Sequence, residues 1–166
     1  PERRKNPGVA GALIVIRQFP VAGFSVLTIA LSHMVMVSVM AMTPAHLDSE
    51  GHSLAEVGFT ISLHIAGMYA FAPVFGNLSD RFGAKPVIAI GQLIFLVSLA
   101  LSGFGQSHFA SVVIGLFLLG LGWSATTVAA SALLSESLGT DDRSKVQGFS
   151  DTLMSLSGAF GGAIAG

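Results

Sequence analysis

A short polar stretch interrupts the apolar sequence at residues 76–86, which read G-N-L-S-D-R-F-G-A-K-P. Its charged and turn-forming residues are Gly76, Asp80, Arg81, Gly83 and Lys85. A glycine such as Gly83 can take a positive φ and reverse the chain tightly. A carboxylate at Asp80 can accept backbone N–H bonds at the start of a following helix. The two cations can pair with carboxylates or lipid phosphates, although an ordinary basic turn beside a membrane contains the same residue types.

Four side chains capable of chemistry lie inside apolar stretches: His33, His64, Trp123 and Asp151. Ionisable groups inside a membrane are candidates for proton or substrate binding, and histidine changes charge near neutral pH. The two histidines are therefore candidate proton carriers, or neutral residues hydrogen-bonded to a neighbouring helix. Asp151 is a further candidate, or it pairs with Lys145 or Arg143. Trp123 indicates either a cavity for an apolar or aromatic substrate, or core packing.

Other kinds of chemistry find no support in the sequence. It contains no cysteine, which excludes disulfides and thiolate metal sites. Three histidines in or near connecting segments lack the spacing of metal ligands: His46, His52 and His108. No nucleophile–base pair, phosphate-binding loop or dinucleotide motif is recognisable. We therefore expect no enzymatic activity, no cofactor, no metal and no nucleic-acid partner.

The composition indicates a membrane protein. Hydrophobic residues make up 52% of the 166 residues and charged residues only 10%, whereas a soluble domain averages about 25% charged residues. About 20 apolar residues cross the hydrocarbon core of a bilayer. Five stretches are long enough to do so: 19–43, 55–75, 86–104, 109–134 and 146–166. The sequence therefore predicts an all-α, polytopic fold with five transmembrane helices in a lipid bilayer.

Prolines and glycines predict details of these helices. Pro44 is expected to end the first span, Pro73 to kink the second, and Pro86 to lie in the first turn of the third. Glycines spaced four residues apart predict close packing, or sliding, between two helices: Gly158, Gly162 and Gly166. The apolar segment 9–16 is too short to span a bilayer and predicts an interfacial helix.

The distribution of charge predicts the topology. The basic residues are Arg3, Arg4, Lys5, Arg17, Arg81, Lys85, Arg143 and Lys145. With five alternating spans, all of them fall on one side of the membrane, in residues 1–18, 76–86 and 136–147. The positive-inside rule makes that side cytoplasmic. We therefore expect a multi-pass protein of the cytoplasmic membrane, with these three segments in the cytoplasm.

The charged turn resembles the loop signature of the major facilitator superfamily, G-x-L-[AS]-D-[RK]-x-G-[RK]-[RK], which joins the second and third helices of each six-helix half. The matching residues are Gly76, Leu78, Ser79, Asp80, Arg81, Gly83 and Lys85. Ala84 departs from the signature, because the family often has a cation there. A second stretch is similar to the family's pattern across the fourth and fifth helices of a half: Glu136, Arg143, Gln147–Gly148, Gly158 and Gly161–Gly162. The resemblance covers residues 19–166.

This resemblance implies a mechanism in which the charged turn is a latch. In the family, ion pairs and helix-end contacts at this turn hold the two halves together when the transporter faces outward, and they break when it opens inward. The resemblance makes Asp80 the central acceptor, with Arg81, Glu136 and Arg143 as candidate partners. The two halves then rock around a site near the middle of the membrane.

The resemblance also implies a place in a longer protein. Five helices after a basic segment look most like helices seven to eleven of a twelve-helix transporter, with residues 1–18 as the end of the linker between halves and residues 19–166 as a partial C-terminal half. We therefore expect a piece of a longer chain whose N-terminal half is the missing partner.

The expected function is proton-coupled efflux of small apolar compounds, driven by the proton gradient, since the apolar interior lacks the fixed cations that an anionic substrate would need. Two alternatives stay open: import of a sugar or another metabolite, and a membrane scaffold that transports nothing.

Overall fold

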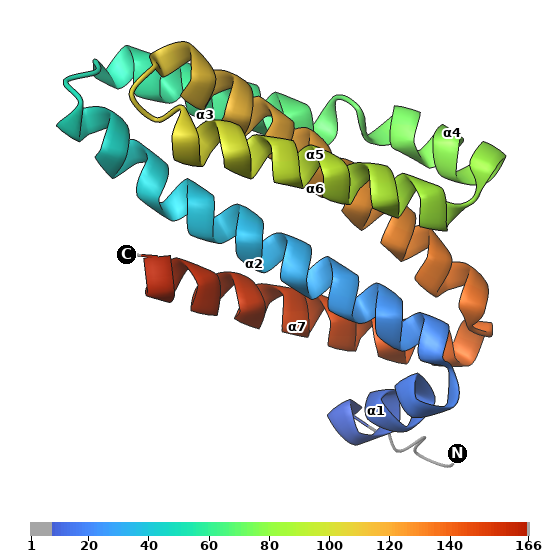
Figure 1. Cartoon of the computed structure of the whole chain (residues 1–166). Helices are drawn as coiled ribbons and strands as arrows, with labels where there is room; N and C mark the ends of the chain where they lie inside the picture. Colours follow the sequence, from blue (N-terminus) through green and yellow to red (C-terminus); the bar gives the residue numbers. More distant parts are fainter. Residues whose placement is uncertain (1–7, 166) are drawn as a thin grey trace.

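The computed structural model describes residues 8–165, and these residues are helical almost throughout (Figure 1). The helices are α1 (Gly8–Gln18), α2 (Pro20–Ser49), α3 (Leu54–Tyr69), α4 (Ala72–Phe82), α5 (Ala84–Phe104), α6 (Phe109–Ser137) and α7 (Thr140–Ala165). Within the described residues there is no strand. The prediction of an all-α fold is confirmed. Four residues used in the sequence predictions lie outside the described residues: Arg3, Arg4 and Lys5 of the basic set, and Gly166 of the glycine stripe.

Four helical segments are long and apolar enough to cross a membrane. They are α2, α3 together with α4 (Leu54–Phe82), α5 and α6. The first four predicted spans correspond to these segments. The fifth predicted span corresponds to α7, which has 26 residues but is more polar, because its first turns contain Asp141, Asp142, Arg143 and Lys145. α7 lies along α2 and runs in the same direction (Figure 1), as expected for two spans that begin on the same side.

The prolines behave differently from one another. The prediction that Pro44 ends the first span is wrong, since α2 continues through Pro44 to Ser49. Membrane helices tolerate proline. Pro44 leaves the Met40 carbonyl without its helical donor, and one residue earlier the Thr43 hydroxyl donates to the Val39 carbonyl at 2.8 Å. The predicted kink at Pro73 is confirmed, because α3 ends at Tyr69 and Pro73 is the second residue of α4.

The charged turn is shorter than the sequence suggested. Residues 76–82 form the last turns of α4, and α5 begins at Ala84, so Gly83 alone separates the two helices. Gly83 has φ 87° and ψ 152°, a conformation open essentially only to glycine. The prediction that Asp80 stands at the start of the next helix is wrong: Asp80 lies in the last turn of α4, since a single glycine is sufficient to reverse the chain.

Helix α6 forms the centre of the bundle, and α2, α3, α4 and α5 all pack against it. Its buried residues include Leu116, Leu119, Ala125, Ala129 and Leu134. Close packing depends on glycine at the crossing with α3, where a Cβ on Gly67 would come within 2.7 Å of the Phe117 carbonyl oxygen. Polar ties supplement this packing: the buried Ser98 hydroxyl of α5 donates to the Gly115 carbonyl at 2.7 Å.

The short helix α1 lies beside the first turns of α2 and α7 (Figure 1). Ala12 and Val15 are buried against these helices, while Val9, Leu13 and Ile14 are exposed. A helix at segment 9–16 is therefore confirmed, and its apolar exposed residues are typical of a helix lying in a membrane interface.

Candidate functional site

A cavity of about 130 Å³ lies among α2, α6 and α7. Its lining residues include Ile29, Trp123, Thr127, Gln147, Ser150 and Asp151. Two residues singled out separately in the sequence, Trp123 of α6 and Asp151 of α7, thus meet at one site. They meet because Trp123, Thr127 and Ser131 recur every four residues and so lie on one face of α6, while Gln147 and Asp151 do the same on α7.

Several polar groups in and around this cavity have no hydrogen-bond partner among the described residues. Trp123 Nε1 and Thr127 Oγ1 are buried, and within residues 8–165 neither has a hydrogen-bond partner. The predicted pairing of Asp151 with Lys145 is not found: the Lys145 ammonium donates to Asp142 at 2.8 Å instead. Arg143 is half-buried and its Nε has no hydrogen-bond partner in the described part of the chain. The Asp151 side chain is exposed at the edge of the cavity.

An aromatic row extends from this cavity across three helices. The Trp123 ring lies between His33 of α2, with ring centroids 6.1 Å apart, and Tyr69 of α3, with centroids 6.2 Å apart and planes at 71°. Tyr69 is 63% exposed at the end of α3. Sequence reasoning missed Tyr69, although the sequence contains one tyrosine only, and its place just before the break at Pro73 is a signal that could have found it.

The two intramembrane histidines have different surroundings. His33 is half-buried, its Nδ1 has no hydrogen-bond partner within residues 8–165, and its ring lies against Gly158 of α7. His64 is 1% exposed, and its Nδ1 donates to the Leu116 carbonyl of α6 at 2.8 Å. The structure therefore places His33 in the aromatic row and His64 at the α3–α6 crossing, apart from the cavity.

The residues of the predicted latch lie at the surface at one end of the bundle. Asp80, Arg81, Lys85 and Glu136 are all exposed. The Arg81 guanidinium lies 5.4 Å from the centre of the Phe82 ring. Gly76 faces Val128 of α6 at ordinary contact distance. No hydrogen bond or ion pair joins Asp80 to a predicted partner among the described residues, so the latch pairing stays a prediction.

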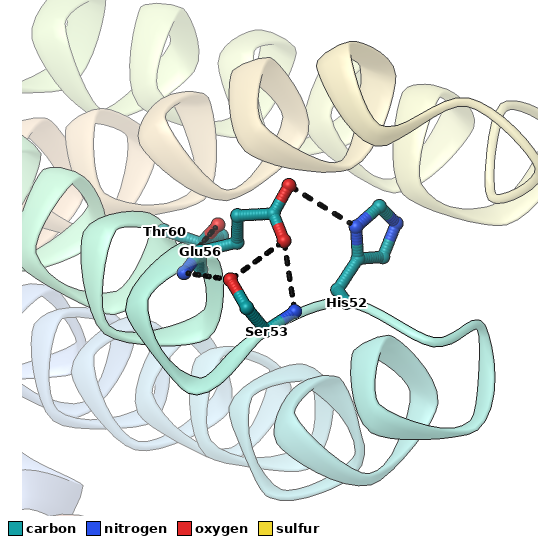
Figure 2. Close-up of polar contacts among 4 residues, drawn as sticks. All are labelled: His52, Ser53, Glu56 and Thr60. Carbon is teal, nitrogen blue, oxygen red and sulfur yellow. Dashed lines mark hydrogen bonds and ion pairs between the residues drawn. The ribbon is translucent and has the colours of Figure 1, made fainter.

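The opposite end of the bundle is held by ordinary polar contacts. Ser53 and Glu56 form a reciprocal capping box at the start of α3, and Glu56 also contacts His52 Nδ1 at 3.5 Å (Figure 2). The His52 ring stacks on Phe109, with centroids 4.5 Å apart, and His46 Nε2 donates to the Gln106 carbonyl at 3.3 Å. These histidines connect the turns α2–α3 and α5–α6. In residues 8–165 no group of three potential ligands from His, Asp and Glu could hold a metal ion.

A comparison with known families decides the identity of this bundle. The profile described as Major Facilitator Superfamily matches residues 25–166, which is most of the chain and includes the charged turn, the cavity and the aromatic row. The chain belongs to the major facilitator superfamily. The predicted resemblance is confirmed, and the chain is a multi-pass membrane protein of a family of transporters.

Individual relatives from this superfamily differ in what their names say they carry. The chain is 39% identical over 137 residues to the uncharacterized MFS-type transporter YddS of Bacillus subtilis (82% of this chain, 31% of the relative). It is 31% identical over 125 residues to the riboflavin transporter RfnT of Brucella anthropi (74% and 31%). It is 35% identical over 98 residues to the multidrug resistance protein MdtL of Klebsiella pneumoniae (58% and 24%). No solved structure matches the chain.

The chain spans about a third of the length of the first two curated relatives that it matches. We therefore propose, below, the activity, substrates and partners of the whole protein.

Proposed function

We propose that this chain is part of a proton-coupled secondary transporter that exports small apolar compounds by alternating access. The observation that supports this most strongly is the Trp123–Asp151 cavity. An exposed carboxylate at membrane depth rarely faces lipid, because its desolvation is costly, and intramembrane acids instead face a bundle interior or a water-filled path. The face of α2, α6 and α7 that carries Asp151 is therefore the face that lines the transport path.

The lining of this face suits compounds that are largely apolar. The aromatic row provides flat apolar surfaces at Trp123 and Tyr69. The neighbouring polar groups include the uncharged Thr127 and Gln147, and Asp151 is the one charged side chain among the described lining residues. No lysine or arginine lies between residues 18 and 80, or between residues 86 and 142. An anionic substrate would find no counter-charge in these segments, which disfavours such substrates.

Asp151 and His33 are the proposed proton carriers. Asp151 lines the cavity, and His33 lies in the aromatic row that extends from it through Trp123. Carboxylate and imidazole groups can both take up and release a proton. His64 is a weaker candidate because its Nδ1 is committed to the Leu116 carbonyl. A proton entering at Asp151 would remove its negative charge, which gives the protein a way to couple proton movement to substrate release.

The charged turn supports alternating access at the cytoplasmic end. Asp80 lies in the last turn of α4, where the helix dipole disfavours a carboxylate, and it is exposed and without an ion-pair partner within residues 8–165. A carboxylate in this position is stabilised when a cation pairs with it in another conformation, because hydrogen bonds between charged groups are the strong ones. We propose that the latch pairs form in that conformation. Residues 1–18, 76–86 and 136–147 then lie in the cytoplasm. Residues 19–166 belong to the C-terminal half of the transporter, which faces an N-terminal half.

Import of a metabolite is the second candidate. A metabolite as substrate is supported by the relative named riboflavin transporter RfnT, which aligns with 74% of this chain. Direction and coupling can be tested with the full-length protein in inside-out membrane vesicles. Proton-coupled export predicts that an imposed gradient, acidic inside, drives accumulation of an apolar dye, and that a protonophore abolishes it. Accumulation that ignores the gradient, or loss of preloaded dye, would contradict export.

A further inference from the structure

We infer that the Trp123–Asp151 cavity binds the ammonium head group of an otherwise apolar organic cation; this narrower substrate class rests on the transport function proposed above. The first step concerns charge. Asp151 is a carboxylate without a protein counter-ion in the described residues, because Lys145, the cation nearest in sequence, is bound to Asp142. A proton or a bound cation can therefore supply its counter-charge.

The second step concerns the aromatic wall of the cavity. The indole of Trp123 provides the aromatic side chain that attracts cations most strongly, by the negative potential of its ring face. A carboxylate and an indole lining one small cavity are the two groups with which proteins recognise substituted ammonium ions. Ile29 and Met154 complete the wall with apolar surface for the alkyl groups on nitrogen.

The third step concerns size. The cavity holds about 130 Å³, and a dry cavity of about 150 Å³ is known to bind benzene. The space therefore suits a trimethylammonium or dialkylammonium head and excludes a whole polycyclic drug. The rest of an amphipathic cation would extend along the aromatic row toward Tyr69, whose side chain is exposed.

The hydroxyl of Thr127 gives a further distinction within this class. It is buried without a partner in the described part of the chain, and a hydroxyl oxygen accepts hydrogen bonds. A protonated amine can donate to it, whereas a quaternary ammonium cannot. The Thr127→Val variant should therefore weaken binding of a protonated amine and leave binding of a quaternary ammonium unchanged.

The test compares benzyltrimethylammonium with its neutral carbon isostere, neopentylbenzene, on the full-length protein in lipid nanodiscs. Asp151→Asn should weaken binding of the cation by about tenfold or more, while the neutral isostere changes by less than about twofold. Trp123→Leu should weaken cation binding by about 2- to 30-fold, the range of a cation–π contact. Asp151→Glu, which keeps the charge, should restore most of the cation affinity, and Asp48→Asn, a distant exposed carboxylate, should change neither ligand.

Other outcomes would overturn the inference. Equal loss of both ligands in Asp151→Asn would mean that the residue acts through shape. Unchanged cation affinity combined with a lost response of flux to pH would make Asp151 a proton carrier only. If the vesicle assay described above detects gradient-driven export of a neutral dye while no variant affects the cation, the substrate class is wrong and the proposed function stands. If the cation binds as expected but no solute is ever moved, the proposed function fails and the binding site stands.

Discussion

The ring of His33 lies directly against Gly158, so that a Cβ added at Gly158 would come within 2.7 Å of His33 Cδ2. This contact joins α2 to α7, which pack against each other. The Ser157 hydroxyl donates to the Ala30 carbonyl at 2.9 Å in the same place, and Gly161 lies as close to the Met34 backbone. Close approach of two helices through small residues is how membrane helices associate.

Gly158→Ala should destabilise the protein by about 1–3 kcal/mol, because the added methyl group has no room beside the histidine ring. Thermal unfolding of the purified protein in detergent would measure the loss. Gly148→Ala is the matched control, since nothing lies within 4 Å of a Cβ at that position on the same helix. His33→Ala should restore much of the stability of Gly158→Ala, and failure of the double variant to recover would contradict the contact.

Gly83→Ala should also be destabilising, for a conformational reason. Gly83 has φ 87°, and forcing an L-residue into this region costs about 1–3 kcal/mol. The same unfolding assay applies, with Gly139→Ala as the control, because Gly139 follows α6, has no positive φ and has open space around it. Equal stability of the two variants would show that α4 and α5 do not depend on this turn.

His64→Ala should lower stability by between about 0.5 and 3 kcal/mol and leave the pH dependence of flux unchanged. The reason is that the ring fills the α3–α6 crossing and donates to the Leu116 carbonyl at 2.8 Å, so its loss removes packing and a hydrogen bond. The exposed His108 provides the control, since His108→Ala should alter stability by less than about 0.5 kcal/mol. A flattened pH profile in His64→Ala would instead make this histidine a proton carrier.

The fold followed from features that are local in sequence. Apolar length and the placement of lysine and arginine predicted the helices and their order. Tertiary context decided the rest: Pro44 did not end α2, and Asp80 turned out to be in α4 rather than before α5, because Gly83 alone makes the turn. The prediction of close helix packing at Gly158, Gly162 and Gly166 was only partly right. Gly158 and Gly161 make the close contacts with α2, whereas Gly162 makes an ordinary one.

The candidate site was predictable residue by residue but not as a constellation. Trp123 and Asp151 stood out because a lone tryptophan and an acid are unusual inside apolar segments. Their proximity could not be predicted, because it depends on the rotation of α6 and α7 about their axes. In the same way, the rotation of α2 places His33 in the aromatic row, and the rotation of α3 turns His64 toward α6 instead. Tyr69 was missed because its contact with Trp123 is between two helices, and its place before the break at Pro73 was the one local signal for it.

Flux and membrane insertion of the Asp80→Asn variant of the full-length protein test the central claim most directly. Proteoliposomes with an imposed pH gradient would report flux, and the amount of folded protein in the membrane would report insertion. The proposed latch predicts that Asp80→Asn inserts at the level of the unaltered protein and loses gradient-driven flux, while Asp48→Asn, at the opposite end of the bundle, retains both. Normal flux through the Asp80→Asn variant would contradict the latch and the alternating-access mechanism built on it.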